Sequence, residues 1–272
     1  MKSVKNHLLR LIKPSATDEN WEYFGDKCPY FGVVTSNQYR PENLDERARA
    51  EFFETGRQYV SWLMDFIRKN INPDFHPKNS VDFGCGVGRL LVPIARESNS
   101  AVGIEVSPSM MKEARANCER LGVQNVQLVE SADALAARRG EFDFINSFIV
   151  FQHIPPKRGY EIFQQLLALL QDGGVGALHF TYCDPGRRRD RYLKPLFRNI
   201  PLLFALKNMV NGKPMLEPRM EMAEYSLNRL YRILHENNCH ISHAVYTYHG
   251  VMGIILVFQK AQIPKSYQWF VG

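Results

Sequence analysis

The feature that most constrains this 272-residue chain is a regular alternation of short apolar segments and amphipathic segments between residues 79 and 182. The apolar segments predict strands, whereas the segments between them carry apolar residues at helical spacing. The expected strands are 80–83, 101–105, 126–130, 142–148 and 175–182, and the expected helices are 88–97, 108–121 and 157–170. Strands that alternate with helices of this length imply an α/β fold with a parallel sheet and right-handed crossovers.

The regions on either side of this alternation differ from it in composition. Residues 14–42 are rich in Asn, Asp, Pro, Gly and aromatic side chains and predict an irregular arm, which a helix over 43–70 follows. After the alternation, a helix is expected over 225–237 and a hairpin over 241–248 and 251–259. The predicted organisation is an N-terminal cap over 1–78, an α/β core over 79–182, an insertion over 183–222, and a closing helix and hairpin over 223–272.

Composition excludes several classes of protein. With 45% hydrophobic and 23% charged residues, the chain is neither disordered nor low in complexity. Five widely spaced cysteines without a CxxC pair argue against a disulfide framework or a zinc site and favour reduced thiols in the cytoplasm. The sequence holds no apolar run near the ~20 residues that span a bilayer. The net charge of +6 is too small by itself to indicate a nucleic-acid partner.

A glycine-rich turn joins the first expected strand to the first expected helix, in the string VDFGCGVGRL that begins at Val81. Glycine at such a turn lets the backbone approach a ligand closely. The GxGxG spacing alone is weak support for a site, because similar turns also serve as plain connections. The turn also lacks the GxGxxG spacing that is typical of nicotinamide-binding proteins, which disfavours that class.

Two acidic residues strengthen the case for a ligand site. Glu105 lies 21 residues after Gly84, at the end of the second expected strand, where a carboxylate can accept hydrogen bonds from two ribose hydroxyls. Asp133 follows the third strand and is placed to accept a hydrogen bond from an exocyclic amine such as that of adenine. The simpler explanations are an exposed strand end for Glu105 and a helix N-cap for Asp133. Ligand contact is favoured because open α/β sheets bind ligands at the carboxyl ends of their strands.

The chain resembles the class I S-adenosylmethionine-dependent methyltransferases in five successive strings: VDFGCGVGRL, GIEVSPSMMKEA, SAD, FDFINSFIVFQHIP and LLQDGGVGALHF. The resemblance covers residues 79–182, in order and at the family's spacing. It implies a Rossmann-like, seven-stranded sheet with helices on both faces, in which the final strand runs antiparallel. It also implies S-adenosylmethionine as the methyl donor and S-adenosylhomocysteine as the product. The flanking segments look similar to a bacterial subgroup of the small-molecule type.

The resemblance further implies roles for individual residues. Gly84, Cys85 and Gly86 would contact the methionine part of the cofactor, and Asp82 would order their turn. Glu105 would bind the ribose. The remaining implied contacts are Val106 and Met110 as walls of the adenine site, Ala132 and Asp133 beside the adenine, and Ser147 and Phe148 at the methyl-donor end.

A general base is harder to assign from the sequence. A sulfonium donor needs alignment more than activation, but a hydroxyl acceptor is helped by a base. His153 is the nearest titratable side chain after the fourth strand, and a structural hydrogen bond at the start of the loop explains it equally well. His249 and Tyr182 are secondary candidates, with a turn residue and a pocket wall as their simpler roles. The absence of paired aspartates or a histidine cluster predicts no metal.

The acceptor is expected under the aromatic residues at 21–31 and the insertion at 183–222. The favoured hypothesis is a methyltransferase acting on an oxygen or nitrogen of a small molecule, such as a metabolite or a glycan. The basic run at 187–198 and the amphipathic start (Val4, Leu8, Leu11 and Ile12) support a second hypothesis, an anionic lipid or macromolecule with contact to a membrane surface. A third is a scaffold that binds S-adenosylmethionine without catalysis. The sequence leaves the acceptor and the oligomeric state open.

Overall fold

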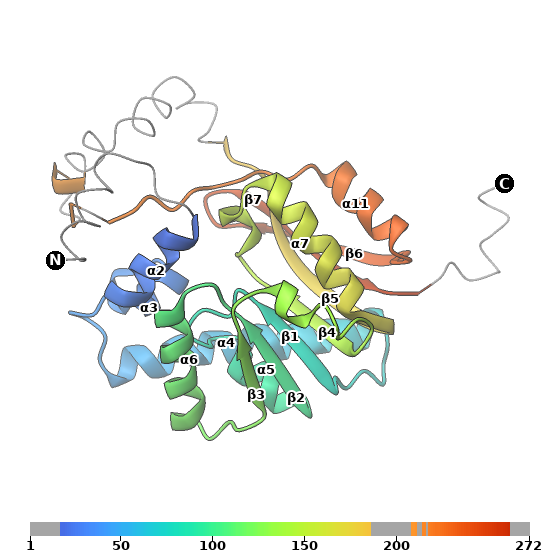
Figure 1. Cartoon of the computed structure of the whole chain (residues 1–272), viewed down its shortest axis with the longest axis horizontal. Helices are drawn as coiled ribbons and strands as arrows, with labels where there is room; N and C mark the ends of the chain where they lie inside the picture. The colour runs from blue at the N-terminus through green and yellow to red at the C-terminus, as the bar shows by residue number, and fades with distance from the viewer. Residues whose placement is uncertain (1–16, 186–207, 211–213, 216, 262–272) are drawn as a thin grey trace, which may run out of the picture.

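The computed structural model describes residues 17–185, 208–210, 214–215 and 217–261, and its core is a mixed seven-stranded sheet. The strands are β1 (Asn79–Phe83), β2 (Ser100–Ile104), β3 (Val126–Val129), β4 (Phe142–Ser147), β5 (Leu170–Cys183), β6 (Ile241–Tyr248) and β7 (Met252–Gln259). Their order across the sheet is β3-β2-β1-β4-β5-β7-β6 (Figure 1). The first five strands are parallel, and β7 runs antiparallel to β5 and β6, which confirms the predicted fold class.

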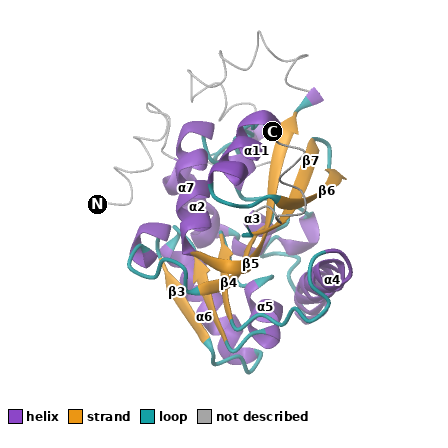
Figure 2. Cartoon of the chain, turned by 90° about the vertical axis from the view of Figure 1, so that its right-hand side faces the viewer, coloured by secondary structure: helices purple, strands orange, loops and turns teal. Residues whose placement is uncertain are grey.

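Helices cover both faces of this sheet. On one face lie α4 (Glu46–Asn70), α5 (Leu91–Glu97) and α6 (Pro108–Arg120), and on the other lie α7 (Pro156–Leu169) and α11 (Leu227–Glu236). Figure 2 shows α4 and α7 on opposite sides of the strands. Along β7, Leu256 packs in the core on the α7 side, whereas its neighbours Ile255 and Val257 pack in the core on the α4 side. The period-2 alternation of a strand buried on both faces explains why β7 is almost wholly apolar.

The N-terminal arm is helical, and the prediction of an irregular arm is wrong for its described part. The helices α2 (Thr17–Lys27) and α3 (Pro29–Val33) and the 3-10 helix η1 (Asn37–Tyr39) occupy this stretch. Phe24 and Phe31 of the arm are buried in one cluster with Phe52 of α4 and Met110 of α6. The density of Pro, Gly and Asn suggested loops, but burial of aromatic side chains contributes far more free energy than local propensity does.

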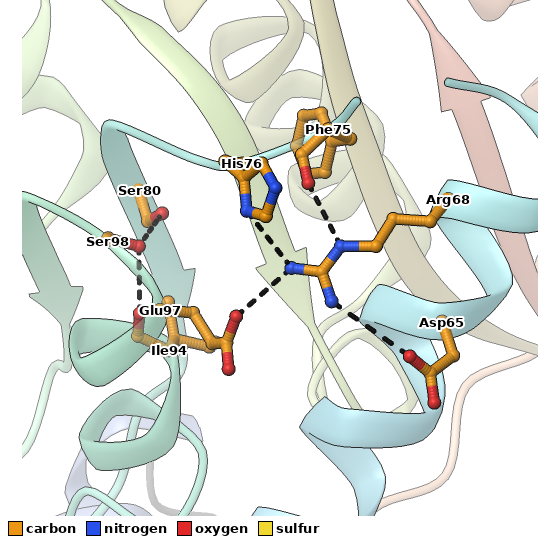
Figure 3. A network of polar contacts seen from close by, with 8 residues as sticks. All are labelled: Asp65, Arg68, Phe75, His76, Ser80, Ile94, Glu97 and Ser98. Carbon is orange, nitrogen blue, oxygen red and sulfur yellow. Dashed lines mark hydrogen bonds and ion pairs between the residues drawn. The ribbon is translucent and has the colours of Figure 1, made fainter. Parts of the chain in front are cut away.

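The long helix α4 is anchored at both of its ends. At the N-terminus, the Asp45 carboxylate accepts a hydrogen bond of 2.7 Å from the Ala48 amide. Toward the C-terminus, Arg68 donates hydrogen bonds to the Phe75 carbonyl oxygen at 3.1 Å and to the Glu97 carboxylate of α5 at 3.2 Å (Figure 3). The contact of Arg68 with Glu97 holds the C-terminal part of α4 against α5.

Replacing the N-cap Asp45 by alanine is expected to lower the free energy of unfolding by about 1 kcal/mol, because the capped amide loses its acceptor. Asp65 on the same helix provides a matched control. Its carboxylate is 78% exposed and lies 4.0 Å from Arg68, so Asp65→Ala should change stability by no more than a few tenths of a kcal/mol. Urea unfolding of the two variants measures the difference. Equal stabilities of the two variants would contradict the capping role.

The fifth strand is longer than predicted. It begins at Leu170 instead of the predicted residue 175, although Gly173 adopts a positive φ of 80°. The Gly173 amide donates to the Lys260 carbonyl oxygen at 2.7 Å, and the Lys260 amide donates to the Gly174 carbonyl oxygen at 2.9 Å. This pairing with the segment after β7 extends the sheet through residues whose composition is typical of a turn.

Two sequence predictions fall outside the described residues. The amphipathic start, with Val4, Leu8, Leu11 and Ile12, precedes residue 17, and the basic run at 187–198 lies between the described segments. Of the expected insertion, residues 183–185, 208–210, 214–215 and 217–222 are described. Among the helices in the described part of the chain, none has both the length and the apolarity to cross a bilayer.

Candidate active site

One cavity of about 860 Å³ opens where β1, β2, β3 and β4 end. Eleven of the residues predicted from the sequence line it: Asp82, Gly84, Cys85, Gly86, Glu105, Val106, Met110, Ala132, Asp133, Phe148 and His153. Ser147 does not line it, because its side chain is fully buried at the end of β4, where its hydroxyl has no hydrogen-bond partner among the described residues. The structure therefore brings the predicted cofactor residues together around one space, with Ser147 as the exception. Of the secondary candidates for the base, His249 lines the cavity and Tyr182 does not.

The glycine turn has a backbone that other residues adopt poorly. Gly84 and Gly86 have φ angles of 72° and 54°, and a Cβ atom on Gly86 would lie 2.6 Å from the Val33 side chain. The amides of Gly84 and Cys85 both donate to the Ile104 carbonyl oxygen, at 2.8 and 3.1 Å. The turn is thus tied to β2 by its own N–H groups. What it offers to a ligand is close backbone approach rather than free amides.

Glu105 is the centre of this arrangement. Its two carboxylate oxygens accept hydrogen bonds from the Gly86 amide at 3.0 Å and the Ser107 amide at 2.9 Å. Burial raises the pKa of Glu105, and these backbone donors oppose the increase. Each carboxylate oxygen can accept a further hydrogen bond. The side chain therefore both closes the glycine turn against β2 and presents acceptor capacity to the cavity.

The acid on the next loop faces the same cavity. Asp133 is exposed in the 3-10 helix η2 (Ala132–Leu135), and its Oδ1 accepts a hydrogen bond of 2.8 Å from Gln165 of α7. Its other carboxylate oxygen has no hydrogen-bond partner in the described part of the chain. Since Glu105 and Asp133 line one space, the predicted pair of acids is on a common edge of the sheet.

An acidic and a basic side chain, Asp82 and Arg89, lie at the other end of the glycine turn. Asp82 accepts a hydrogen bond of 2.7 Å from the Asn146 side chain, and burial raises its pKa to about 7 despite that bond and the nearby Arg89. The Arg89 Nε atom is buried and has no hydrogen-bond partner among the described residues. One of its terminal nitrogens donates to the Thr55 hydroxyl at 3.4 Å. This end of the cavity thus presents a carboxyl group and a cation with donor capacity to spare.

The cavity wall at Phe148, which is expected at the methyl-donor end of the cofactor, is backed by a second aromatic ring. The Phe148 ring packs against Tyr59 of α4, with 4.3 Å between ring centroids. The next residue, Ile149, has a φ of 60°, which is an outlier for a β-branched side chain and costs on the order of 1–3 kcal/mol. Strain of this kind persists where neighbouring residues are held in place, and here both Phe148 and Val150 line the cavity.

His153 ends the 3-10 helix η3 (Phe151–His153), and both of its ring nitrogens have partners. Nδ1 lies 2.7 Å from the Glu221 carbonyl oxygen, and Nε2 lies 3.1 Å from the Gln152 side-chain nitrogen. Burial lowers its pKa to about 4. Of the two explanations that the sequence left open, this geometry favours the structural hydrogen bond. His153 touches the cavity with its ring, whose nitrogens are occupied.

The cavity also has walls that strand-and-helix patterns do not reveal. The N-terminal arm contributes Trp21, Val33 and Thr35, and the segment before α11 contributes Met220 and Met222. For the arm, the sequence feature that indicated a place near the cavity was the group of aromatic residues at 21–31. No local pattern singles out the two methionines, since only the tertiary fold brings residues near 220 to the mouth of the cavity.

The polar side chains that line the cavity fit an adenosyl sulfonium ligand. A buried carboxylate suits ribose hydroxyls, a second carboxylate suits the adenine amine, and the Asp82–Arg89 end matches an amino acid, which carries one charge of each sign. The buried Nε atom of Arg89 has no acceptor among the described residues, which independently indicates that a ligand supplies an acceptor at this end. Among the described residues, no group of three His, Cys, Asp or Glu side chains could hold a metal ion.

Comparison with known sequences agrees with this geometry. A family model described as a methyltransferase domain matches residues 81–174. The chain is 33% identical over 79 residues to a ubiquinone biosynthesis O-methyltransferase of Methylococcus capsulatus, covering 29% of this chain and 33% of that one. The protein of the same name from Dinoroseobacter shibae is 30% identical over 138 residues, or 51% of this chain and 53% of its own. An uncharacterized RNA methyltransferase of Nostoc is 26% identical over 43% of this chain and 25% of its own.

The chain therefore spans between a quarter and about half of the length of these relatives. Among solved structures, its fold is similar to that of magnesium protoporphyrin IX methyltransferase from Synechocystis with bound S-adenosylhomocysteine. The TM-score is 0.58 over 90% of this chain and 100% of that chain, at 18% identity. A second structure of that protein, with bound S-adenosylmethionine, gives a TM-score of 0.53 over 89% and 97% of the two chains, also at 18% identity. Residues 81–174 thus match a methyltransferase domain, and the fold of the chain is similar to that of a methyltransferase that binds S-adenosylmethionine.

Proposed function

We propose that this protein binds S-adenosylmethionine at the carboxyl ends of β1 to β4 and transfers its methyl group to an oxygen or nitrogen of a small-molecule acceptor. The observation that carries the proposal is the single cavity of about 860 Å³ that contains both acids and a separate aromatic end. Cavities that enclose one small ligand are typically ~300–1,000 Å³, so the volume of this one suits a ligand of the size of the cofactor.

Residues of this chain can be assigned to the parts of the cofactor. Glu105 would accept hydrogen bonds from the ribose and Asp133 from the adenine amine, with Val106 and Met110 beside the ring. Asp82 and Arg89 would bind the amino acid end, next to the glycine turn. When bound, the cofactor supplies a methyl group that is already activated by its sulfonium.

The proposed acceptor end has apolar side chains in its wall, namely Trp21, Phe148, Met220 and Met222. An ion pair of 3.0 Å between Arg40 of the arm region and Glu217 is largely buried and ties two of these walls together. Holding the acceptor in line in a dry site is the main task of an enzyme whose donor is already activated.

A small acceptor is favoured over RNA by this enclosure. The named relatives include both O-methyltransferases of ubiquinone biosynthesis and an RNA methyltransferase, so they leave the substrate class open. RNA bases are usually recognised by stacking and basic grooves. The cavity lining includes two basic side chains, Arg89 and Arg158, and Arg158 is paired with Asp18 at 2.8 Å.

The test is a transfer assay with methyl-labelled S-adenosylmethionine against catechols, simple phenols, primary amines and total RNA. Label is expected in one of the small molecules, with Glu105→Ala protein as the background. Label in RNA alone would contradict the proposed acceptor class. Binding of the cofactor without transfer to any compound would instead support a scaffold.

A further inference from the structure

Three histidines from three different elements lie close together beside the cavity. His153 ends η3, His179 lies in β5, and His249 occupies the turn between β6 and β7. The His179 and His249 rings are 5.4 Å apart, and the buried His179 bonds through Nε2 to the Thr247 hydroxyl at 2.9 Å. His153 and His249 line the cavity. Which of their nitrogens carries a proton can be worked out from one backbone carbonyl.

The tautomer of His153 is fixed by its contact with Glu221. A carbonyl oxygen only accepts hydrogen bonds, so the Nδ1 atom at 2.7 Å must carry the proton. Since the pKa of His153 is lowered to about 4, the ring is neutral near pH 7 and its Nε2 atom is bare. That bare nitrogen therefore accepts the hydrogen bond of 3.1 Å from the amide nitrogen of Gln152.

The orientation of the Gln152 amide follows from this bond. With its nitrogen toward His153, its oxygen faces the Thr181 hydroxyl at 3.0 Å and the Nε2 atom of His249 at 3.1 Å. Gln152 and Thr181 are both buried, so the amide is held in one position. The oxygen accepts from both neighbours, which requires that Nε2 of His249 carry its proton.

The lone pair of a neutral His249 ring is consequently on Nδ1. That atom has no hydrogen-bond partner among the described residues, and the side chain is exposed at the cavity wall. Partial burial lowers the pKa of His249 from its ordinary value, which keeps the ring neutral near pH 7. The titratable rings that face it are His153 and His179, both with lowered pKa values.

We propose that His249 is the general base for a hydroxyl acceptor and that Gln152 and His153 position it. The assignment rests on the proposed methyl transfer and narrows the acceptor to an oxygen nucleophile. As the acceptor oxygen forms its bond to the methyl carbon, the carbon–sulfur bond breaks and its electron pair stays on sulfur. The hydroxyl proton goes to Nδ1 of His249, while Nε2–H stays bonded to Gln152. Because the side chain is exposed, the proton then passes from Nδ1 to solvent.

The first test reads the histidine tautomers directly and needs no acceptor. Two-bond proton–nitrogen NMR spectra of the ¹⁵N-histidine-labelled chain at pH 7.5 should show His249 protonated at Nε2 and His153 at Nδ1. In Gln152→Leu protein, His249 is expected to lose its single tautomer, while the fold is checked by circular dichroism. A His249 ring protonated at Nδ1 in the wild-type protein overturns the assignment. So does a single tautomer that survives Gln152→Leu.

The second test measures transfer to catechol and to 4-nitrophenol, which ionises much more readily. His249→Gln should lower kcat/KM on catechol by about 100-fold or more, and by much less on 4-nitrophenol, which needs no base. The exposed His76 is the matched control, and His76→Gln should leave both rates unchanged. Calorimetric affinity for S-adenosylmethionine should be the same in both variants.

These outcomes separate the two proposals. If the wild-type protein does not bind S-adenosylmethionine, the proposed function fails, and the NMR result still decides the state of His249. If the protein methylates amines alone, or if His249→Gln slows both phenols equally, the role of His249 as a base is wrong while methyl transfer stands.

Discussion

Replacing Glu105 by alanine is expected to weaken the binding of S-adenosylmethionine by at least about 100-fold. The carboxylate would accept two hydrogen bonds from the ribose, and bonds to a charged acceptor contribute about 1.5–3 kcal/mol each. Since about 1.4 kcal/mol corresponds to tenfold in affinity, two such bonds give 100-fold or more. The same change removes the acceptor of the Gly86 and Ser107 amides, which loosens the glycine turn from β2.

Isothermal titration calorimetry measures this effect, with two further variants as controls. Glu105→Gln keeps one acceptor oxygen and should lose less affinity than Glu105→Ala. Glu141→Ala removes an exposed carboxylate that pairs with Arg138 outside the cavity, and it should bind like the wild type. Unchanged affinity in a folded Glu105→Ala protein would refute the assignment of the ribose site.

The affinity for S-adenosylmethionine is expected to fall about 30-fold between pH 8 and pH 5.5. The pKa of Asp82 is raised to about 7, and a protonated carboxyl cannot pair with the ammonium of the cofactor. Binding must then displace the proton, which costs about tenfold in affinity for each pH unit below that value. The charged and titratable groups around Asp82 are Arg89, Glu105 and Tyr59.

Asp82→Asn provides the control for this pH dependence. The variant should bind the cofactor more weakly at pH 8 and show a nearly flat profile between pH 5.5 and 8. A pH profile in Asp82→Asn as steep as that of the wild type would assign the titration to another group. For the ligand-free protein, the raised pKa of Asp82 makes the free energy of unfolding higher at low pH, whereas cofactor binding is stronger at high pH. The folded-state pKa lies above the ordinary value of 3.8, so the contribution of Asp82 to the free energy of unfolding is complete below pH 3.8. That contribution is lost as the pH rises through about 7.

The order of the core elements could be predicted because it depends on local signals. The helix expected over 108–121 is observed as α6, and the hydroxyl of its N-cap residue Ser107 accepts a hydrogen bond from the Met110 amide. The acids after the second and third strands fell in one cavity because the carboxyl ends of neighbouring parallel strands share an edge. Spacing along the chain therefore sufficed to place the proposed cofactor contacts around one cavity.

The acceptor end could not be predicted in the same way, because its residues meet only through tertiary contacts. Gln152 contacts both His153 and His249. Because Gln152 and His249 are 97 positions apart in the sequence, no local pattern predicts their contact. The sequence favoured His153 over His249 because His153 is the nearest titratable side chain after the fourth strand. The Glu221 carbonyl oxygen, which occupies Nδ1 of His153, lies 68 residues away. Ser147 was misplaced for a related reason, since the side chains at the end of β4 alternate between core and cavity.

The most direct test of the account is a crystal structure of the protein grown with S-adenosylhomocysteine. Density is expected for the ribose at the Glu105 carboxylate, for the adenine beside Asp133, and for the amino acid end at Asp82 and Arg89. The sulfur should then face the aromatic end of the cavity that contains Phe148. Density for the adenosyl group elsewhere on the molecule, or a cavity that stays empty at saturating ligand, would contradict it.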